Sequence, residues 1–188
     1  AMRHHVPLLV RSSFSDERGT LVVDEDQIVE QEDVSGIAYL SDEAKITIEQ
    51  VLDRPGVSAA IFGPLADAGI NVDMIVQNTS ADGEHMDLTF TVSRSDLERS
   101  VQVLDSAGEE LGFDRITTDD NVVKISVIGV GMRSHAGIAQ KMFSALAERG
   151  INIQVISTSE IKISVLIASE YTELALRSLH SAYDLDAS

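Results

Sequence analysis

Residues 56–75 read GVSAAIFGPLADAGINVDMI, and residues 137–156 read GIAQKMFSALAERGINIQVI. Aligned without a gap, the two stretches share eight identical positions, and most of the other pairs exchange similar side chains. Such self-similarity indicates that one structural unit occurs twice in the chain. The identical pairs are Gly56/Gly137, Phe62/Phe143, Leu65/Leu146, Ala66/Ala147, Gly69/Gly150, Ile70/Ile151, Asn71/Asn152 and Ile75/Ile156.

The residues around each stretch predict the same order of elements in both copies. Alternation of apolar and polar side chains is typical of half-buried strands, and apolar spacing of three to four is typical of helices. Gly69 and Gly150 lie where a glycine commonly ends a helix. Strands are expected at 45–48, 70–77 and 86–92 and at 124–127 and 161–167, with helices after Gly56, after Gly137, at 96–111 and at 172–183.

Each copy thus reads strand–helix–strand–strand–helix, and one more strand would complete a ferredoxin-like βαββαβ unit. Residues 113–118 can supply that strand in the first copy, but the second copy ends in a short polar segment. We therefore expect residues 34–40 (VSGIAYL) to cross over and complete the second sheet. The predicted fold class is α+β, with two interleaved ferredoxin-like domains formed by residues 41–120 and by residues 34–40 plus 121–188.

The segment that precedes Val34 does not belong to the repeat. Residues 1–23 contain two short apolar strands around a polar loop, and residues 24–33 hold six acidic side chains in ten positions. A run of like charge is typical of a solvated linker. We expect residues 1–23 to be the C-terminal end of another domain.

Composition excludes several classes of function. The chain has 188 residues, a formal net charge of −17, 4% aromatic residues and no cysteine. Nucleic-acid binding requires a basic footprint, and an acidic surface disfavours anionic lipid, so neither nucleic acid nor membrane is an expected partner. The absence of cysteine fits a reducing cytoplasm.

No catalytic or metal-binding constellation is evident, so we expect no catalytic residues and no metal site. The chain contains no P-loop, and Gly129-Val130-Gly131 is only half of a dinucleotide-binding fingerprint. His135 has no second histidine at the spacing of metal ligands. Carboxylates are abundant, but no pair can be singled out as acid and base.

The loop Asp53-Arg54-Pro55-Gly56 is the better candidate for a binding site. It precedes a predicted helix whose free N–H groups favour an anion such as a carboxylate, and Asp53 offers the opposite charge for an ammonium group. A free amino acid carries both groups, and Gln77 could contact its side chain. A plain turn capped by Asp53 remains an alternative.

Several motifs resemble the paired ACT domains in the C-terminal regulatory region, or β subunit, of the aspartate kinase (aspartokinase) family. They are DRPG, AGINVDMIVQNTS, GMRSHAGIAQ and GINIQVISTSEIKISVLI. The segment from Val6 to Phe14 and Gly19-Thr20-Leu21 is similar to the last strands of that family's catalytic domain. The resemblance covers essentially the whole chain.

The resemblance implies an allosteric region that binds end-product amino acids between ACT domains and thereby feedback-inhibits phosphorylation of aspartate by ATP. It also implies a homodimer formed through the ACT domains, and an aspartate kinase catalytic domain or α subunit as partner. ATP and Mg would bind that catalytic domain, so this chain is expected to hold no cofactor and to be inactive alone. Another ACT-type amino-acid sensor or interaction module without a kinase is the alternative function.

The resemblance also implies two effector sites and two positions that set feedback sensitivity. Threonine is favoured at the first site, and lysine is the candidate for the second, although Ala139 lacks a hydroxyl that the family often has there. The first site comprises Asp53, Gly56, Ser58 and Gln77, with Asn152 and Ile153 from a facing second domain. The second comprises Ser134, His135, Gly137, Ile138 and Ala139 with Asn71, Val72 and Asp73, and the sensitivity positions are Ser80 and Ser159.

Overall fold

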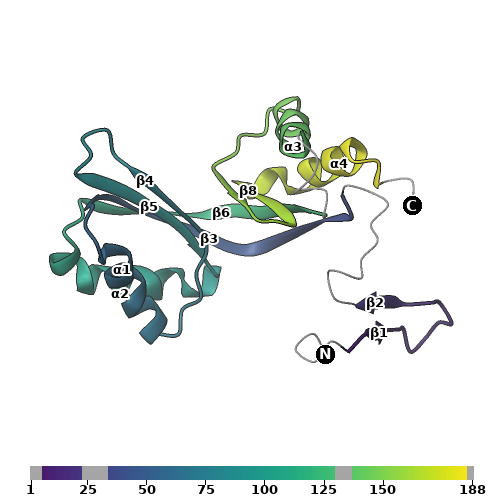
Figure 1. The fold of residues 1–188 in the computed structure, drawn as a ribbon, viewed down its shortest axis with the longest axis horizontal. Helices are drawn as coiled ribbons and strands as arrows, with labels where there is room; N and C mark the ends of the chain where they lie inside the picture. Colours follow the sequence, from purple (N-terminus) through teal and green to yellow (C-terminus); the bar gives the residue numbers. More distant parts are fainter. Residues whose placement is uncertain (1–5, 23–33, 130–136, 186–188) are drawn as a thin grey trace.

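The computed structural model describes residues 6–22, 34–129 and 137–185 (Figure 1). A short hairpin at the N-terminal end is followed by a six-stranded antiparallel sheet that carries two pairs of helices. The strands are β1 (Leu8–Val10), β2 (Thr20–Val22), β3 (Gly36–Leu52), β4 (Asp73–Thr79), β5 (His85–Val92), β6 (Arg115–Ile128), β7 (Val155–Thr158) and β8 (Lys162–Ala168). The helices are α1 (Val57–Asp67), α2 (Leu97–Leu111), α3 (Ile138–Ala147) and α4 (Thr172–Ala182), and the 3-10 turns η3 (Arg94–Asp96) and η5 (Ser169–Tyr171) precede α2 and α4.

The strand order β4-β5-β3-β6-β8-β7 contains two ferredoxin-like sheets that share two long strands. The C-terminal part of β3 pairs with β5 and with the N-terminal part of β6, which completes the first sheet. The N-terminal part of β3, from Gly36 to Leu40, pairs with Lys124–Ile128 of β6, which in turn pairs with β8. The predicted crossover of residues 34–40 into the second sheet is therefore confirmed.

The expected elements differ from the observed ones where strands join. Residues 36–40 and 45–48 belong to one strand of 17 residues that begins at Gly36, and residues 115–128 form another of 14. The expected domain boundaries after residues 40 and 120 lie within these continuous strands. The predicted strand at 70–77 begins only at Asp73, because the N–H of Ile70 is bonded to the carbonyl of Leu65 at the end of α1.

Both repeat helices end in a left-handed glycine, as predicted. Gly69 has φ 71° and Gly150 has φ 67°. The N–H groups of Ile70 and Ile151 reach back to the carbonyls of Leu65 and Leu146, which is the pattern of a helix C-terminus closed by glycine. This turn directs the chain from each helix toward the following strand.

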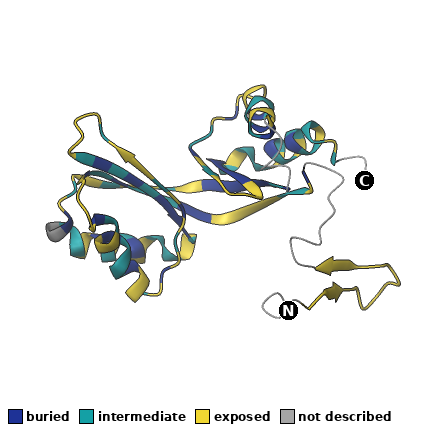
Figure 2. Ribbon diagram, in the orientation of Figure 1, coloured by how far each residue is buried: buried dark blue, intermediate teal, exposed yellow. Residues whose placement is uncertain are grey.

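Each half of the sheet has its own core. In Figure 1 the pair α1 and α2 lies below the first half, whereas α3 and α4 lie above the second half. Figure 2 shows the buried residues concentrated where the helices face the strands. The first core includes Ile46, Phe90 and Leu104, and the second includes Ile125, Met142 and Leu179.

A third, smaller apolar cluster joins the two halves on the sheet face that the helices leave uncovered. Met74 and Val76 of β4 pack there with Val155 of β7, and Val122 and Leu166 complete the cluster. β4 and β7 are the two outermost strands of the sheet, so the sheet curves until its ends meet. We call the region around this cluster the seam.

The hairpin of β1 and β2 stands apart from the sheet in Figure 1, and all of its residues are exposed. Among the described residues, no helix is long and apolar enough to cross a membrane.

Candidate functional site

The start of α1 is an open helix terminus next to a tight loop. The N–H of Asp53 bonds to the carbonyl of Glu84 (2.9 Å), and the N–H of Val57 bonds to the carbonyl of Arg54 (3.1 Å). Gly56 adopts φ 92°, and no side chain caps the helix. The next N–H groups of the first turn, those of Ser58 and Ala59, have no partner within the helix and carry a partial positive charge, and Asp53 lies exposed three residues before Gly56.

Ser58 and Gln77 come together beside this terminus. The Ser58 hydroxyl lies 3.3 Å from Gln77 Oε1 and can donate to it. Ser58 is in the first turn of α1 and Gln77 is in β4, so the contact spans helix and strand at the open end. The structure thus groups four of the predicted first-site residues, namely Asp53, Gly56, Ser58 and Gln77, in one neighbourhood.

Asn152 and Ile153 lie in the second unit, between α3 and β7. Asn152 is exposed, and Ile153 is partly buried against the second core. Within the described part of the chain, no hydrogen bond or ion pair joins either residue to Ser58 or Gln77. Their role in a first site formed with a facing chain stays a prediction.

The start of α3 repeats the geometry of α1. Gly137 has φ 115° and no side chain caps the helix. The Ile138 carbonyl accepts a 2.7 Å hydrogen bond from the Tyr183 hydroxyl, and burial raises the pKa of Tyr183 to about 12. Ala139 is half-buried in the second core. The predicted second-site residues Ser134 and His135 lie outside the described residues.

The other strand of the predicted second site is occupied by a charge pair. Asn71 is exposed and Val72 is half-buried, but Asp73 accepts hydrogen bonds from Lys124 Nζ and from the N–H of Met74. Partial burial would raise the pKa of Asp73, but these hydrogen bonds outweigh it and hold the pKa below its usual value. The negative charge of this carboxylate is therefore already compensated by Lys124 of the same chain.

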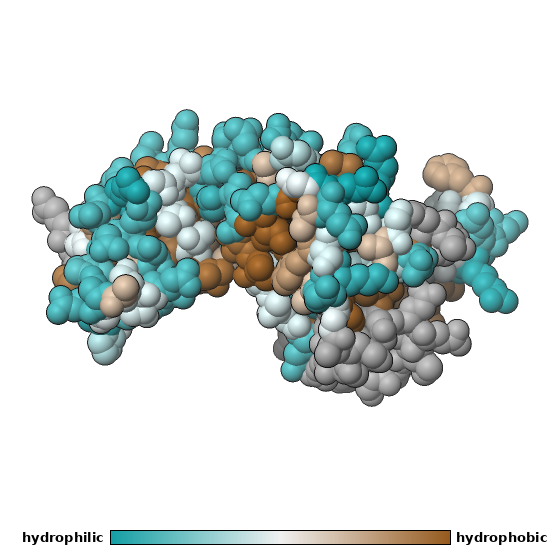
Figure 3. Space-filling view, turned by 90° about the horizontal axis from the view of Figure 1, so that it is seen from above, coloured by the Kyte–Doolittle hydropathy of each residue, from teal (hydrophilic) through white to brown (hydrophobic). Residues whose placement is uncertain are grey.

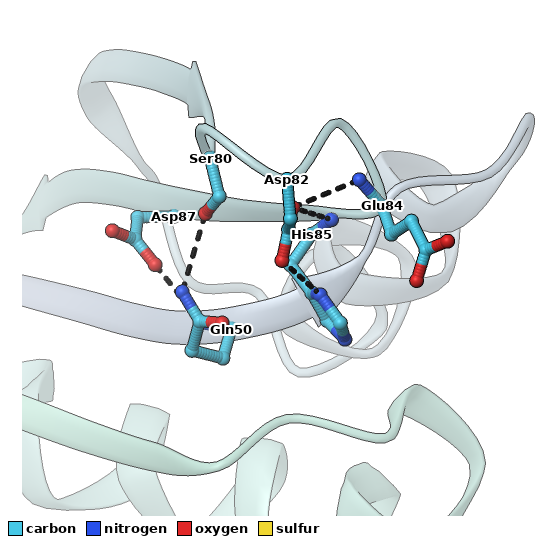
Figure 4. Close-up of polar contacts among 6 residues, drawn as sticks. All are labelled: Gln50, Ser80, Asp82, Glu84, His85 and Asp87. Atoms are coloured by element: carbon cyan, nitrogen blue, oxygen red, sulfur yellow. Dashed lines mark hydrogen bonds and ion pairs between the residues drawn. The ribbon is translucent and has the colours of Figure 1, made fainter.

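The two predicted sensitivity positions occupy equivalent places before hairpin turns. Ser80 follows β4 and Ser159 follows β7, and each donates its N–H across the turn, to His85 and to Lys162 respectively. Figure 4 shows that Gln50 of β3 reaches the Ser80 hydroxyl, at 3.2 Å.

Gln50 connects Ser80 to the first-site loop. It has φ 58° and lies at an irregularity in the pairing of β3 with β5, where its N–H bonds to Asp87 Oδ1 at 2.9 Å. β3 ends two residues later at Leu52, immediately before Asp53. The position of the loop is thereby tied to the turn that contains Ser80.

The same turn is organised by Asp82 (Figure 4). Its carboxylate accepts from the N–H groups of Glu84 and His85 and contacts the His85 imidazole at 2.8 Å. The Glu84 N–H and then the His85 contacts lower the pKa of Asp82 to about 2.

A cavity of about 340 Å³ opens in the seam. Residues from both halves line it, including Val76, Asn78 and Thr89 from the first and Ile153, Gln154 and Ile156 from the second. Figure 3 shows apolar residues gathered near the middle of the molecule. The cavity places the Ile153 segment against β4, the strand that also carries Gln77.

The seam also holds a polar network that sequence reasoning missed. It comprises Glu43, Lys45, Asp119, Lys124 and Gln154. A signal was present in the repeat, because Lys45 and Lys124 occupy corresponding positions, as do Asp73 and Gln154. Hydrophobic periodicity does not reveal such pairs, since their partners are distant in the sequence.

Comparison with known protein families agrees with this fold. Two ACT domain models match the chain, one over residues 46–109 and the other over residues 125–183. The aspartate kinase of Pseudomonas fluorescens is 50% identical over 188 residues, which are 100% of this chain and 45% of that protein. The chain thus spans about half the length of the curated relatives it matches.

Two solved structures are covered by this chain almost completely. A structure described as aspartokinase alpha and beta subunits has 49% identity and a TM-score of 0.75 over 80% of this chain and 99% of its own. The ligand-free regulatory subunit of aspartate kinase from Thermus thermophilus has 37% identity and a TM-score of 0.76 over 81% and 99%.

Proposed function

Since this chain belongs to the ACT-domain regulatory regions of the aspartate kinase family, we propose that it senses end-product amino acids and feedback-inhibits the phosphorylation of aspartate by ATP. Threonine is the proposed ligand of the first site and lysine the candidate for the second. The catalytic partner is an aspartate kinase domain, in the same polypeptide or as a separate subunit. ATP and Mg would be held by that partner.

The observation that carries the proposal is the open terminus of α1 beside Ser58 and Gln77. Uncapped N–H groups can donate hydrogen bonds to a ligand carboxylate, and Asp53 can pair with the ligand's ammonium group. The Ser58 hydroxyl and the Gln77 amide can bond to a ligand hydroxyl, which threonine has. Such groups complement a small zwitterion.

The proposed mechanism is a linkage between binding and the arrangement of two chains. In this proposal Asn152 and Ile153 of a second copy close the first site, so the ligand binds only one relative arrangement of the copies. A ligand shifts such an equilibrium by its differential affinity, typically about 1–3 kcal/mol. Two-fold symmetry would present the same surface from both copies.

Titration calorimetry of the full chain with threonine, lysine and methionine tests this proposal. Threonine is expected to bind, and Asp53→Ala and Gln77→Ala should each weaken binding at least tenfold, because each removes a contact to a charged or polar ligand group. Asp67→Ala, at the exposed far end of α1, is a matched control and should leave the affinity unchanged. Threonine binding that survives both site substitutions would contradict the assignment.

A further inference from the structure

Two lysines of the seam occupy corresponding positions in the two repeats, and each bonds to a residue of the other unit. Lys45 lies on β3 and Lys124 lies on β6, at corresponding positions of the two copies. Both belong to the sheet face that the helices leave uncovered, because the residues next to them, Ala44, Ile46, Val123 and Ile125, belong to the helix-side cores. Each lysine reaches from its own unit into the other.

Lys124 belongs to the second unit, and its partner Asp73 is the first residue of β4 in the first unit. Its Nζ also lies 2.9 Å from Glu43 Oε1 of β3. Lys124 and Glu43 are almost completely buried, with 5% and 6% exposure. Burial alone would lower the pKa of Lys124, but the carboxylates of Asp73 and Glu43 outweigh it and raise the pKa, so Lys124 keeps its positive charge.

Lys45 belongs to the first unit and bonds to Gln154 of the second, with 2.5 Å between Nζ and Oε1. The amide nitrogen of Gln154 in turn donates to Asp119 of β6 at 3.3 Å. The backbone N–H of Gln154 bonds to the carbonyl of Leu166 in β8. This link is neutral at one end and only partly buried, unlike the charged link of Lys124.

The two links are related by the repeat. Asp73 and Gln154 correspond to each other in the same alignment that pairs Asn71 with Asn152. Each therefore lies two positions after an asparagine in the segment that leads into β4 or β7. A lysine on the first strand of each unit, β3 or β6, thus bonds to the segment that leads into β7 or β4 of the other unit.

We propose that Lys45 and Lys124 are positioning residues that set, across the seam, the segments 152–154 and 71–73 that the two effector sites use. This inference rests on the proposed function, because it assigns these segments to ligand sites. Lys45 lies on β3, the strand shared by both units and leading to the Asp53 loop. A displacement of the 152–154 segment can therefore reach that loop through one side chain.

The neutral link is the better one to test, since removing Lys124 would leave the buried Glu43 without its cation and would endanger folding. Lys45→Met keeps an unbranched apolar stem as far as Cε but removes the Nζ donor. Lys162→Met, at an exposed lysine of β8, is the matched control. The exchanged double variant Lys45→Gln/Gln154→Lys restores a donor and an acceptor across the same gap and is the rescue.

Threonine affinity by calorimetry is the first readout. Lys45→Met should weaken binding by roughly tenfold, the value of one hydrogen bond from a charged donor, and Lys162→Met should not. The exchanged variant should recover most of the loss. Unchanged affinity in Lys45→Met, or a loss that the exchange fails to rescue, would overturn the proposal.

Amide hydrogen exchange at Gln154, measured without ligand, is the second readout and separates this proposal from the proposed function. Lys45→Met should speed exchange at the Gln154 amide several-fold. Exchange at the amides of β7, the strand that follows Gln154 and pairs with β8, should stay unchanged. If the wild-type chain bound no amino acid, the proposed function would fail while this measurement still decided the link. Exchange at Gln154 equal to that of the wild type would show that Lys45 does not hold the segment.

Discussion

Thr91 lies buried in the seam, and its hydroxyl has no hydrogen-bond partner in the described part of the chain. Its hydroxyl is the single buried side-chain polar atom without a hydrogen bond among the residues that the structure describes. It lies on β5, opposite Lys45 in β3 and Asp73 in β4. An unpaired buried hydroxyl costs free energy, so this position is not optimised for stability.

Thr91→Val should therefore stabilise the chain. Valine has nearly the same shape and no hydroxyl to desolvate, so we expect the free energy of unfolding to rise by about 1 kcal/mol. The measurement is urea denaturation followed by circular dichroism. Thr89→Val on the same strand breaks a 2.9 Å hydroxyl contact with Thr47 and should not stabilise. A loss of stability in Thr91→Val would show that its hydroxyl has a partner, such as water.

Asp82 predicts the acid response of the β4–β5 turn. Its folded-state pKa of about 2 lies below the ordinary 3.8, so its stabilisation is complete above pH 3.8 and is lost as the pH falls through about 2. The Asp82 side-chain carboxyl carbon should therefore titrate with a midpoint near 2 in NMR spectra. Asp82→Asn should abolish this titration and speed amide exchange at Glu84 and His85. A midpoint near 4 would mean that the turn is not held by this carboxylate.

Each of the two repeat helices begins at a glycine whose backbone conformation only glycine tolerates well. Gly56 and Gly137 have φ 92° and 115°, in the left-handed region. A Cβ at either position would meet open space, so the restriction lies in the backbone alone. These glycines turn the chain so that the helix N–H groups face outward.

A pair of glycine substitutions separates backbone strain from packing. Gly56→Ala should lower the free energy of unfolding by roughly 1 kcal/mol because alanine disfavours the left-handed region. Gly36→Ala, at the start of β3 and also next to open space but outside the left-handed region, should raise it by about 0.5–1 kcal/mol. Thermal unfolding monitored by circular dichroism measures both. Equal effects of the two substitutions would contradict the backbone explanation.

The elements that sequence alone predicts are those with a clear period and a repeated copy. The helices, the C-terminal glycines and the grouping of Ser58 with Gln77 follow from local pattern and from resemblance. The continuity of β3 does not, because its middle, LSDEAK, reads as a polar loop. The structure explains it: Glu43 is buried by an ion pair with Lys124, which lies far away in the sequence. Such a pairing is tertiary and leaves no periodic signal.

Over residues 34–185, β3 and β6 interleave the two ferredoxin-like units, so neither unit is structurally independent of the other. Each strand contributes to both sheets, and the seam adds apolar and ionic contacts between the halves. We expect one cooperative unfolding transition for residues 34–185, with equal calorimetric and van't Hoff enthalpies in scanning calorimetry. Two resolved transitions from the sheet would contradict this coupling.

The most direct test of amino-acid sensing is a map of backbone amide shifts during threonine titration of the isotope-labelled chain. We expect saturable changes at the Asp53–Ser58 loop, at Gln77 and at Asn152 and Ile153, and none at the β1–β2 hairpin. Saturating threonine that leaves all of these amides unshifted, or that shifts only residues far from both helix starts, would contradict amino-acid sensing by this chain.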